Sequence, residues 1–159
     1  MTRRSMVGAA AGVAASLVVA TQAPAESFKD KGGVTVFVPT SVETTKQADG
    51  TTVLKIASTG IGITDLPFPF DYMKSQCTGT TFVGADGKPG RSRGMCEVLS
   101  SKGDRAAYTF VGDASGGRAT WIDGSGAYAG IKGVTTYKPK VVMPGGGAVF
   151  EWAGSWQTD

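Results

Sequence analysis

The 159-residue sequence contains no histidine and no asparagine. Without histidine, the chain cannot form a Ser-His-Asp or Cys-His catalytic site, and it has no imidazole ligands for zinc or iron. Its two cysteines are too few for a thiolate metal cage, and the absence of asparagine excludes N-linked glycosylation. We therefore expect a protein that works without a metal ion or another cofactor.

An excess of charge is also lacking. The formal net charge is +3, and two of the positive charges belong to Arg3 and Arg4 near the start of the chain. The other lysines and arginines are scattered, apart from the stretch KPGRSR at residues 88–93, whose proline and glycine indicate a solvated loop. This distribution gives no electrostatic basis for binding nucleic acid.

A single long hydrophobic run is present, at residues 6–20. It follows Arg3 and Arg4, precedes the small-residue sequence Ala23-Pro24-Ala25, and is shorter than the roughly 20 residues of a membrane-spanning helix. We expect residues 1–25 to be a signal peptide of either the ordinary or the twin-arginine type. This leaves one domain at 26–159, exported to the periplasm or secreted, with no membrane span after the signal is removed.

The two cysteines lie on strand-like segments that a glycine-rich loop connects. Thiols of exported proteins are usually oxidised, so a disulfide between Cys77 and Cys96 on neighbouring antiparallel strands is expected. The alternative, a nucleophilic thiol, lacks a histidine as its base.

Glycine occurs 24 times, while hydrophobic residues make up 41% of the chain, a combination typical of turn-rich β-structure. No segment after the signal keeps a helical period. Eight segments instead alternate or bear β-branched and aromatic residues between turn signals, at the spacing of a barrel or sandwich. They are residues 33–43, 51–58, 77–83, 93–100, 106–111, 118–122, 131–138 and 148–156.

Residues 66–73, with the sequence LPFPFDYM, form an apolar segment that cannot be a regular strand, because two prolines lack the backbone donor. Its side chains must be buried, which predicts a plug or lid over one end of the sheet. Several strands are apolar on both faces. We therefore expect the outer surface to be covered by a partner subunit in a homo-oligomer.

The segment at residues 124–133 has glycine at 124, 126, 130 and 133 around Tyr128 and Ile131. Closely spaced glycines indicate a tight connection between two strands, with Tyr128 and Ile131 as apolar anchors. This pattern resembles the G-T-G-x-[YF]-x-G-I-x-G signature of allene oxide cyclase-like and dirigent-like β-barrels. The Gly103-Asp104 turn and the following strand with Tyr108 resemble bacterial exported members.

The resemblance covers about residues 75 to 138 and implies an eight-stranded antiparallel closed barrel with few or no helices. Such barrels hold a small apolar or aromatic molecule in the lumen and often form trimers. Their activities include cyclisation of an epoxide, stereochemical steering of radical coupling and a tautomerising demethylation by a secreted enzyme similar to this chain. The signature lies on a turn, so it predicts the fold and assigns no catalytic residue.

Two carboxylates are candidate catalytic residues. Asp71 lies among aromatic residues, where burial would raise its pKa and suit it to proton transfer; a solvated loop aspartate is the alternative. Glu151 shares a strand face with small neighbours, which predicts either space for a ligand or a solvent-facing position. Candidate ligand-binding residues are Phe70, Tyr72, Tyr108 and Trp121, although aromatic residues of a small barrel also serve as core.

These features support three hypotheses. The first is a cofactor-free isomerase, cyclase or demethylase that acts by acid–base chemistry. The second is a non-catalytic binding or carrier protein with the same lumen. The third is a structural surface protein with a filled barrel, whose function lies in its oligomer contacts.

Overall fold

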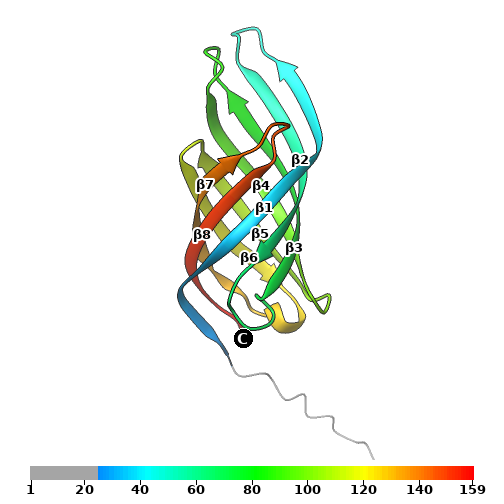
Figure 1. The fold of residues 1–159 in the computed structure, drawn as a ribbon, viewed down its shortest axis with the longest axis vertical. Helices are drawn as coiled ribbons and strands as arrows, with labels where there is room; N and C mark the ends of the chain where they lie inside the picture. The colour runs from blue at the N-terminus through cyan, green and yellow to red at the C-terminus, as the bar shows by residue number, and fades with distance from the viewer. Residues whose placement is uncertain (1–24) are drawn as a thin grey trace, which may run out of the picture.

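The computed structural model describes residues 25–159, which form eight strands and one short turn of 3-10 helix (Figure 1). Apart from Ala25, the expected signal peptide lies outside the described residues. The elements are β1 (Ser27–Lys46), β2 (Thr52–Ile63), β3 (Tyr72–Val83), β4 (Pro89–Ser100), β5 (Arg105–Asp113), β6 (Gly116–Gly124), η1 (Gly126–Tyr128), β7 (Lys132–Val142) and β8 (Ala148–Gln157).

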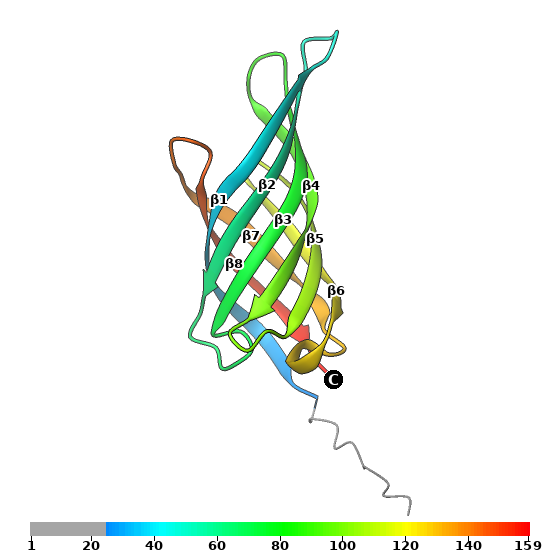
Figure 2. The same ribbon diagram turned by 90° about the vertical axis from the view of Figure 1, so that its right-hand side faces the viewer.

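The strands form a closed barrel in which each strand pairs with its neighbours in sequence and β1 pairs with β8. All pairings are antiparallel, and Figure 2 shows the strands tilted across the barrel axis. The predicted all-β, eight-stranded antiparallel barrel is confirmed. No described helix is long and apolar enough to cross a membrane.

Several strands are longer than the sequence predicts. β1 begins at Ser27 instead of residue 33, and β2 continues through Gly60 and Gly62 to Ile63. β7 runs past Pro139 to Val142, because a register shift between Pro139 and Val141 accommodates the residue that cannot donate a backbone hydrogen bond. The hairpins β1–β2 and β3–β4 therefore rise beyond the other two (Figure 1).

Large aromatic side chains inside the barrel lie opposite glycines of the neighbouring strand. Phe110 of β5 is the direct register partner of Gly94, and a Cβ added at Gly94 would overlap its ring. The same pairing recurs around the barrel. The pairs are Phe37 with Gly60, Tyr137 with Gly117, and Trp152 with Gly33. Each ring can therefore lie against the wall.

The apolar segment between β2 and β3 closes the lower end of the barrel, as the sequence predicts for a plug. Phe70 is completely buried and packs edge-on against Phe28 and Tyr128. The Tyr128 hydroxyl donates a hydrogen bond of 2.7 Å to the carbonyl of Pro69. Trp156 lies 5.1 Å from Phe70 between ring centroids. These rings form a solid floor.

The glycine-rich connection at residues 124–133 completes this floor. Tyr128 and Ile131 are buried, which confirms their prediction as anchors. Gly126 and Gly130 have φ of +62° and +64°, a left-handed conformation that other residues adopt at a cost. The connection therefore depends on glycine at these two turning points.

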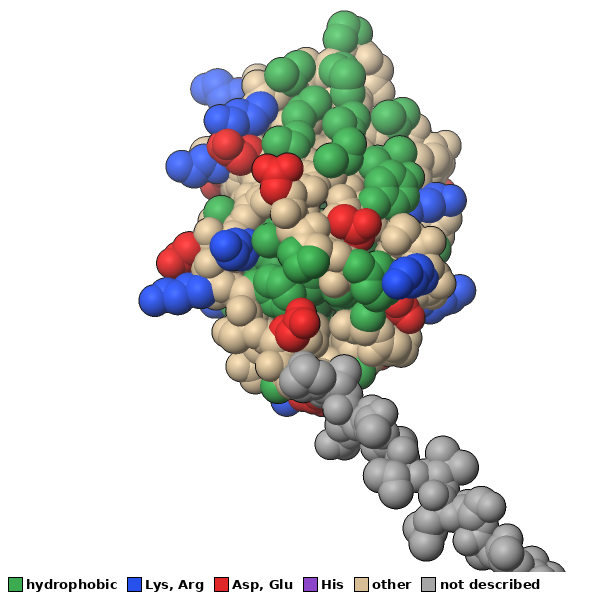
Figure 3. All heavy atoms as spheres, turned by 60° about the horizontal axis from the view of Figure 1, so that its bottom comes forward, with side chains coloured by type: hydrophobic (Ala, Val, Ile, Leu, Met, Phe, Trp, Pro, Cys, Tyr) green, Lys and Arg blue, Asp and Glu red, His purple; other side chains and the backbone are tan. Residues whose placement is uncertain are grey.

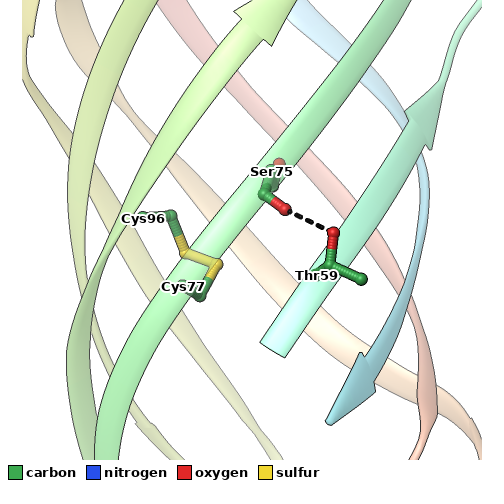
Figure 4. The surroundings of a disulfide bond; sticks show 4 residues. All are labelled: Thr59, Ser75, Cys77 and Cys96. Atoms are coloured by element: carbon green, nitrogen blue, oxygen red, sulfur yellow. Dashed lines mark hydrogen bonds between the residues drawn. A yellow bond between two sulfur atoms is a disulfide. The ribbon is translucent and has the colours of Figure 1, made fainter. Parts of the chain in front are cut away.

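Cys77 of β3 and Cys96 of β4 are register partners and form the predicted disulfide (Figure 4). Two residues before Cys77 on β3, the carbonyl of Ser75 accepts a hydrogen bond from the Thr59 hydroxyl of β2. Cross-linking a loop of this length stabilises a fold by about 3 kcal/mol through the entropy of the unfolded chain. The bond is compatible with an exported protein.

We expect Gly94→Ala to lower the free energy of unfolding by about 1–3 kcal/mol, because the added methyl group would overlap the Phe110 ring and the Thr78 carbonyl. Urea unfolding followed by circular dichroism measures this. The matched control is Gly90→Ala on the same strand, where the nearest atom would be the Phe82 carbonyl oxygen at 3.1 Å. Equal stability losses in the two variants would contradict the ring-over-glycine interpretation.

Candidate ligand cavity

A cavity of about 270 Å³ occupies the barrel above the aromatic floor. This is near the lower end of the roughly 300–1,000 Å³ of small-molecule sites, so it suits a ligand of one or two rings. Exposed residues such as Asp113 and Gly146 belong to its lining, which places the mouth at the end opposite the floor. The eight strands thus form a cup with one closed end.

Aromatic rings make up much of the cavity wall. On one side, Tyr108 of β5 and Trp121 of β6 contact edge to face with centroids 5.1 Å apart. On the other side, Phe150 of β8 contacts Phe37 and Tyr137, at 6.0 and 5.6 Å. A planar apolar molecule would therefore meet ring surfaces on two sides.

Most polar groups of the wall are uncharged. The indole N–H of Trp152 donates a hydrogen bond of 3.0 Å to the Thr35 hydroxyl, and the hydroxyls of Thr81 and Ser92 lie 2.9 Å apart. Ser58, Ser75 and Thr135 also line the cavity. In the part of the chain that the structure describes, Asp113 at the mouth is the one charged residue of the lining.

Two cavity tyrosines are weaker acids than usual. Burial raises the pKa of Tyr137 to about 12, and the nearby Asp113 carboxylate adds to the increase. Burial raises the pKa of Tyr108 well above its usual value, with the Ser75 hydroxyl acting in the opposite direction. Both phenols therefore stay protonated at neutral pH and can donate hydrogen bonds to a ligand.

The structure brings two of the four predicted ligand-binding residues to the cavity. Tyr108 and Trp121 line it, although the indole nitrogen of Trp121 is buried and has no hydrogen-bond partner among the described residues. Trp121 therefore offers its ring surface and not its N–H group. Phe70 belongs to the floor, and Tyr72 is 40% exposed outside the barrel, next to Ile63 in register.

The two carboxylates predicted as catalytic, Asp71 and Glu151, are not among the residues that line the cavity. Glu151 faces outward and pairs with Lys140 at 2.7 Å, and both side chains are more than half exposed. Its outward position follows from β8, where Phe150, Trp152 and Trp156 occupy the inner face. Asp71 is exposed at the end of the plug segment, because the adjacent Phe70 takes the buried position.

Sequence reasoning missed several wall residues. Phe37, Tyr137, Phe150 and Trp152 were detectable, because strand alternation places them on the same face as other apolar residues. Asp113 gave no such signal. It is out of phase with the inward-facing Tyr108 and Phe110, and it borders the cavity as the last residue of β5, at the mouth.

Among residues 25–159, no group of three or more Cys, Asp or Glu side chains is close enough to hold a metal ion. The chemistry available to a bound molecule is therefore ring contact, hydrogen bonding from phenol and hydroxyl groups, and one carboxylate at the mouth. This arrangement can fix the orientation of a ligand.

The sequence matches no protein-family model, and a search of curated proteins finds no match. Among solved structures, the barrel is similar to the pterocarpan synthase dirigent protein GePTS1, with a TM-score of 0.53 and 10% sequence identity. The alignment covers 92% of this chain and 99% of that protein. At this identity the similarity shows a shared fold, in agreement with the dirigent-like barrel that the sequence predicts.

We expect the free energy of unfolding to fall as the pH rises above about 10. The unfolded chain loses its tyrosine protons near pH 10, whereas Tyr108 and Tyr137 retain theirs in the folded barrel. Tyr108, the more deeply buried of the two, lowers the free energy of unfolding by at most about 1.4 kcal/mol per pH unit. The contribution of Tyr137 is smaller because water screens its charge. Urea unfolding at pH 9, 10 and 11 measures the slope, which Tyr108→Phe should reduce; a constant free energy would contradict it.

Proposed function

We propose that this protein is an exported barrel that binds one small, largely apolar or aromatic molecule in its cavity. The observation that carries the proposal is the cavity itself, with a sealed aromatic floor, ring surfaces on two sides and a mouth at the opposite end. A barrel whose function lay only in its outer surface would have no need of such a space. Binding would hold a reactive molecule in one orientation.

A binding role is better supported than acid–base catalysis. The phenols of Tyr108 and Tyr137 have raised pKa values and stay protonated at neutral pH, so they are not available as bases, while Asp71 and Glu151 are directed into solvent. If a reaction does occur in the cavity, Asp113 beside Tyr137 is the pair best placed to move a proton. This cofactor-free isomerase or cyclase activity is the second candidate function.

We also propose that the barrel self-associates through the outer surface of β2, β1, β8 and β7. Val36 is in register with Ile61 on one side and with Val149 on the other, and Val149 is in register with Val141. These four form an apolar row across four strands. Figure 3 shows hydrophobic side chains gathered on the outer surface in view, with charged side chains among them. A trimer is the form that the family resemblance favours.

Binding is tested by filling the cavity. Ala119 of β6 is buried and lines it, so Ala119→Leu should lower the affinity for aromatic ligands at least about tenfold by occupying their space. The matched control is Thr120→Leu, one residue further along, whose side chain points outward. Native mass spectrometry identifies co-purified molecules, and quenching of tryptophan fluorescence by a panel of phenols, quinones and one- to three-ring aromatic amines gives the affinities.

Equal affinities in the wild type and in both variants would place binding outside the cavity and overturn the proposal. Product analysis of the same incubations separates the two candidate functions. Saturable binding without a product supports the binding protein, and turnover that Asp113→Asn abolishes supports the enzyme.

Self-association has its own prediction. We expect the wild type to sediment at a multiple of its monomer mass and Val36→Lys to sediment as a monomer, because the new charge would have to be buried between subunits. Val111→Lys on β5, also outward and more than half exposed, is the control and should keep the wild-type mass. A monomeric wild type at concentrations of about 50 μM, within the micromolar range of specific complexes, would contradict the prediction.

A further inference from the structure

The charge of the cavity lining restricts the ligand more sharply than its shape does. Within residues 25–159, Asp113 is the one charged residue that lines the cavity, and neither lysine nor arginine lines it. A bound carboxylate or phosphate would have no cation to pair with and would face the Asp113 carboxylate. The wall therefore disfavours anions.

Hydrogen bonds hold the Asp113 carboxylate in place and in its charged form. Its Oδ1 accepts hydrogen bonds from the backbone N–H of Ser115 at 2.8 Å and from the Ser115 hydroxyl at 2.6 Å. These two bonds keep the pKa of Asp113 below its usual value. Hydrogen bonding from the backbone N–H of Gly116 contributes to the same lowering of the pKa, and Asp113 is exposed to solvent.

The Tyr137 ring reaches across β6 toward Asp113. Gly117 and Gly112 leave the space for its hydroxyl, and Gly112 immediately precedes Asp113. On its other side Tyr137 contacts Phe150 at an interplanar angle of 88°, and Phe150 contacts Phe37 at 71°. Three rings in two edge-to-face contacts thus lie on one side of the cavity, and Asp113 lies at its mouth.

Among residues 25–159, no lysine or arginine near the mouth forms an ion pair with Asp113, although Lys138 lies beside Gly116, the register partner of Asp113. Arg91 borders the same surface depression as Asp113, but no ion pair within 4.0 Å joins them among residues 25–159. Lys140 is paired with Glu151 on the outer surface. Aromatic faces combined with one carboxylate are the features by which proteins bind ammonium groups.

We propose that the cavity selects small aromatic or apolar molecules that carry a positively charged amine or quaternary ammonium group, held between the Asp113 carboxylate and the rings of Phe37, Tyr137 and Phe150. This inference rests on the proposed binding function and adds the charge of the ligand to it. The alternative explanation of Asp113, a carboxylate that only stabilises the β5–β6 turn, predicts no preference for cations.

The test compares benzyltrimethylammonium with neopentylbenzene, which has the same shape with carbon in place of the charged nitrogen. Isothermal titration calorimetry on the full mature chain should give a cation affinity about tenfold above that of the neutral compound, as a partly desolvated cation–π contact supplies. The measured quantity is the ratio of the two affinities. A general loss of structure lowers both affinities and leaves this ratio unchanged.

Three variants locate the preference. Asp113→Asn keeps an acceptor for Ser115 and should lower the ratio about threefold, and Phe150→Leu should lower it by a similar factor. The control is Asp49→Asn, because the Asp49 carboxylate likewise accepts the backbone N–H two residues on, at Thr51, but lies outside the cavity lining. It should leave the ratio unchanged.

A wild-type ratio near one, with both compounds bound, overturns the cation preference and leaves the binding function intact. If Asp49→Asn lowers the affinity ratio as much as Asp113→Asn does, the assigned site is wrong. The preference would then depend on the net charge of the protein alone. If neither compound binds, the cation preference is wrong. If the aromatic panel also fails to bind, the proposed function fails with it.

Discussion

The interaction on which the rest of this barrel depends is the packing of an aromatic ring against a glycine of the adjacent strand. An eight-stranded barrel has an interior only wide enough for side chains or one small ligand. Rings as large as those of Trp152 and Phe110 would block it if they projected toward the axis. Opposite Gly33 and Gly94 they can lie along the wall instead, so the barrel gains apolar burial and still retains a cavity.

The same packing separates the barrel into a solid part and a hollow part. At the lower end, Phe28 is stacked on Trp156, and Phe70 packs edge-on against Phe28 and Tyr128. Higher up, serine, threonine and glycine alternate with the rings and leave the axis free. The packed floor and the cavity thus occupy different halves of one sheet, and the disulfide lies in the wall of the half that contains the cavity.

Strand alternation and turn chemistry made the fold predictable from the sequence. Glycines 124, 126, 130 and 133 indicated the tight connection, and the two prolines of the apolar segment indicated the plug. The candidate site was less predictable. Glu151 was considered for the cavity because its neighbours Val149 and Ala153 are small, whereas burial of Phe150 and Trp152 decided which face points inward. Asp113 borders the mouth as the last residue of β5, although alternation places it out of phase with the inward-facing Tyr108 and Phe110.

The unequal heights of the hairpins shape the approach to the cavity. Because β1–β2 and β3–β4 extend past the rest, the rim is slanted, with a tall side and a low side (Figure 1). On the tall side, Val42 of β1 is the register partner of Ile56, which lines the cavity. The Val42 side chain is about half exposed. Under the proposed function, a ligand that approaches from the low side would pass Asp113 before it contacts Ile56 and Val42.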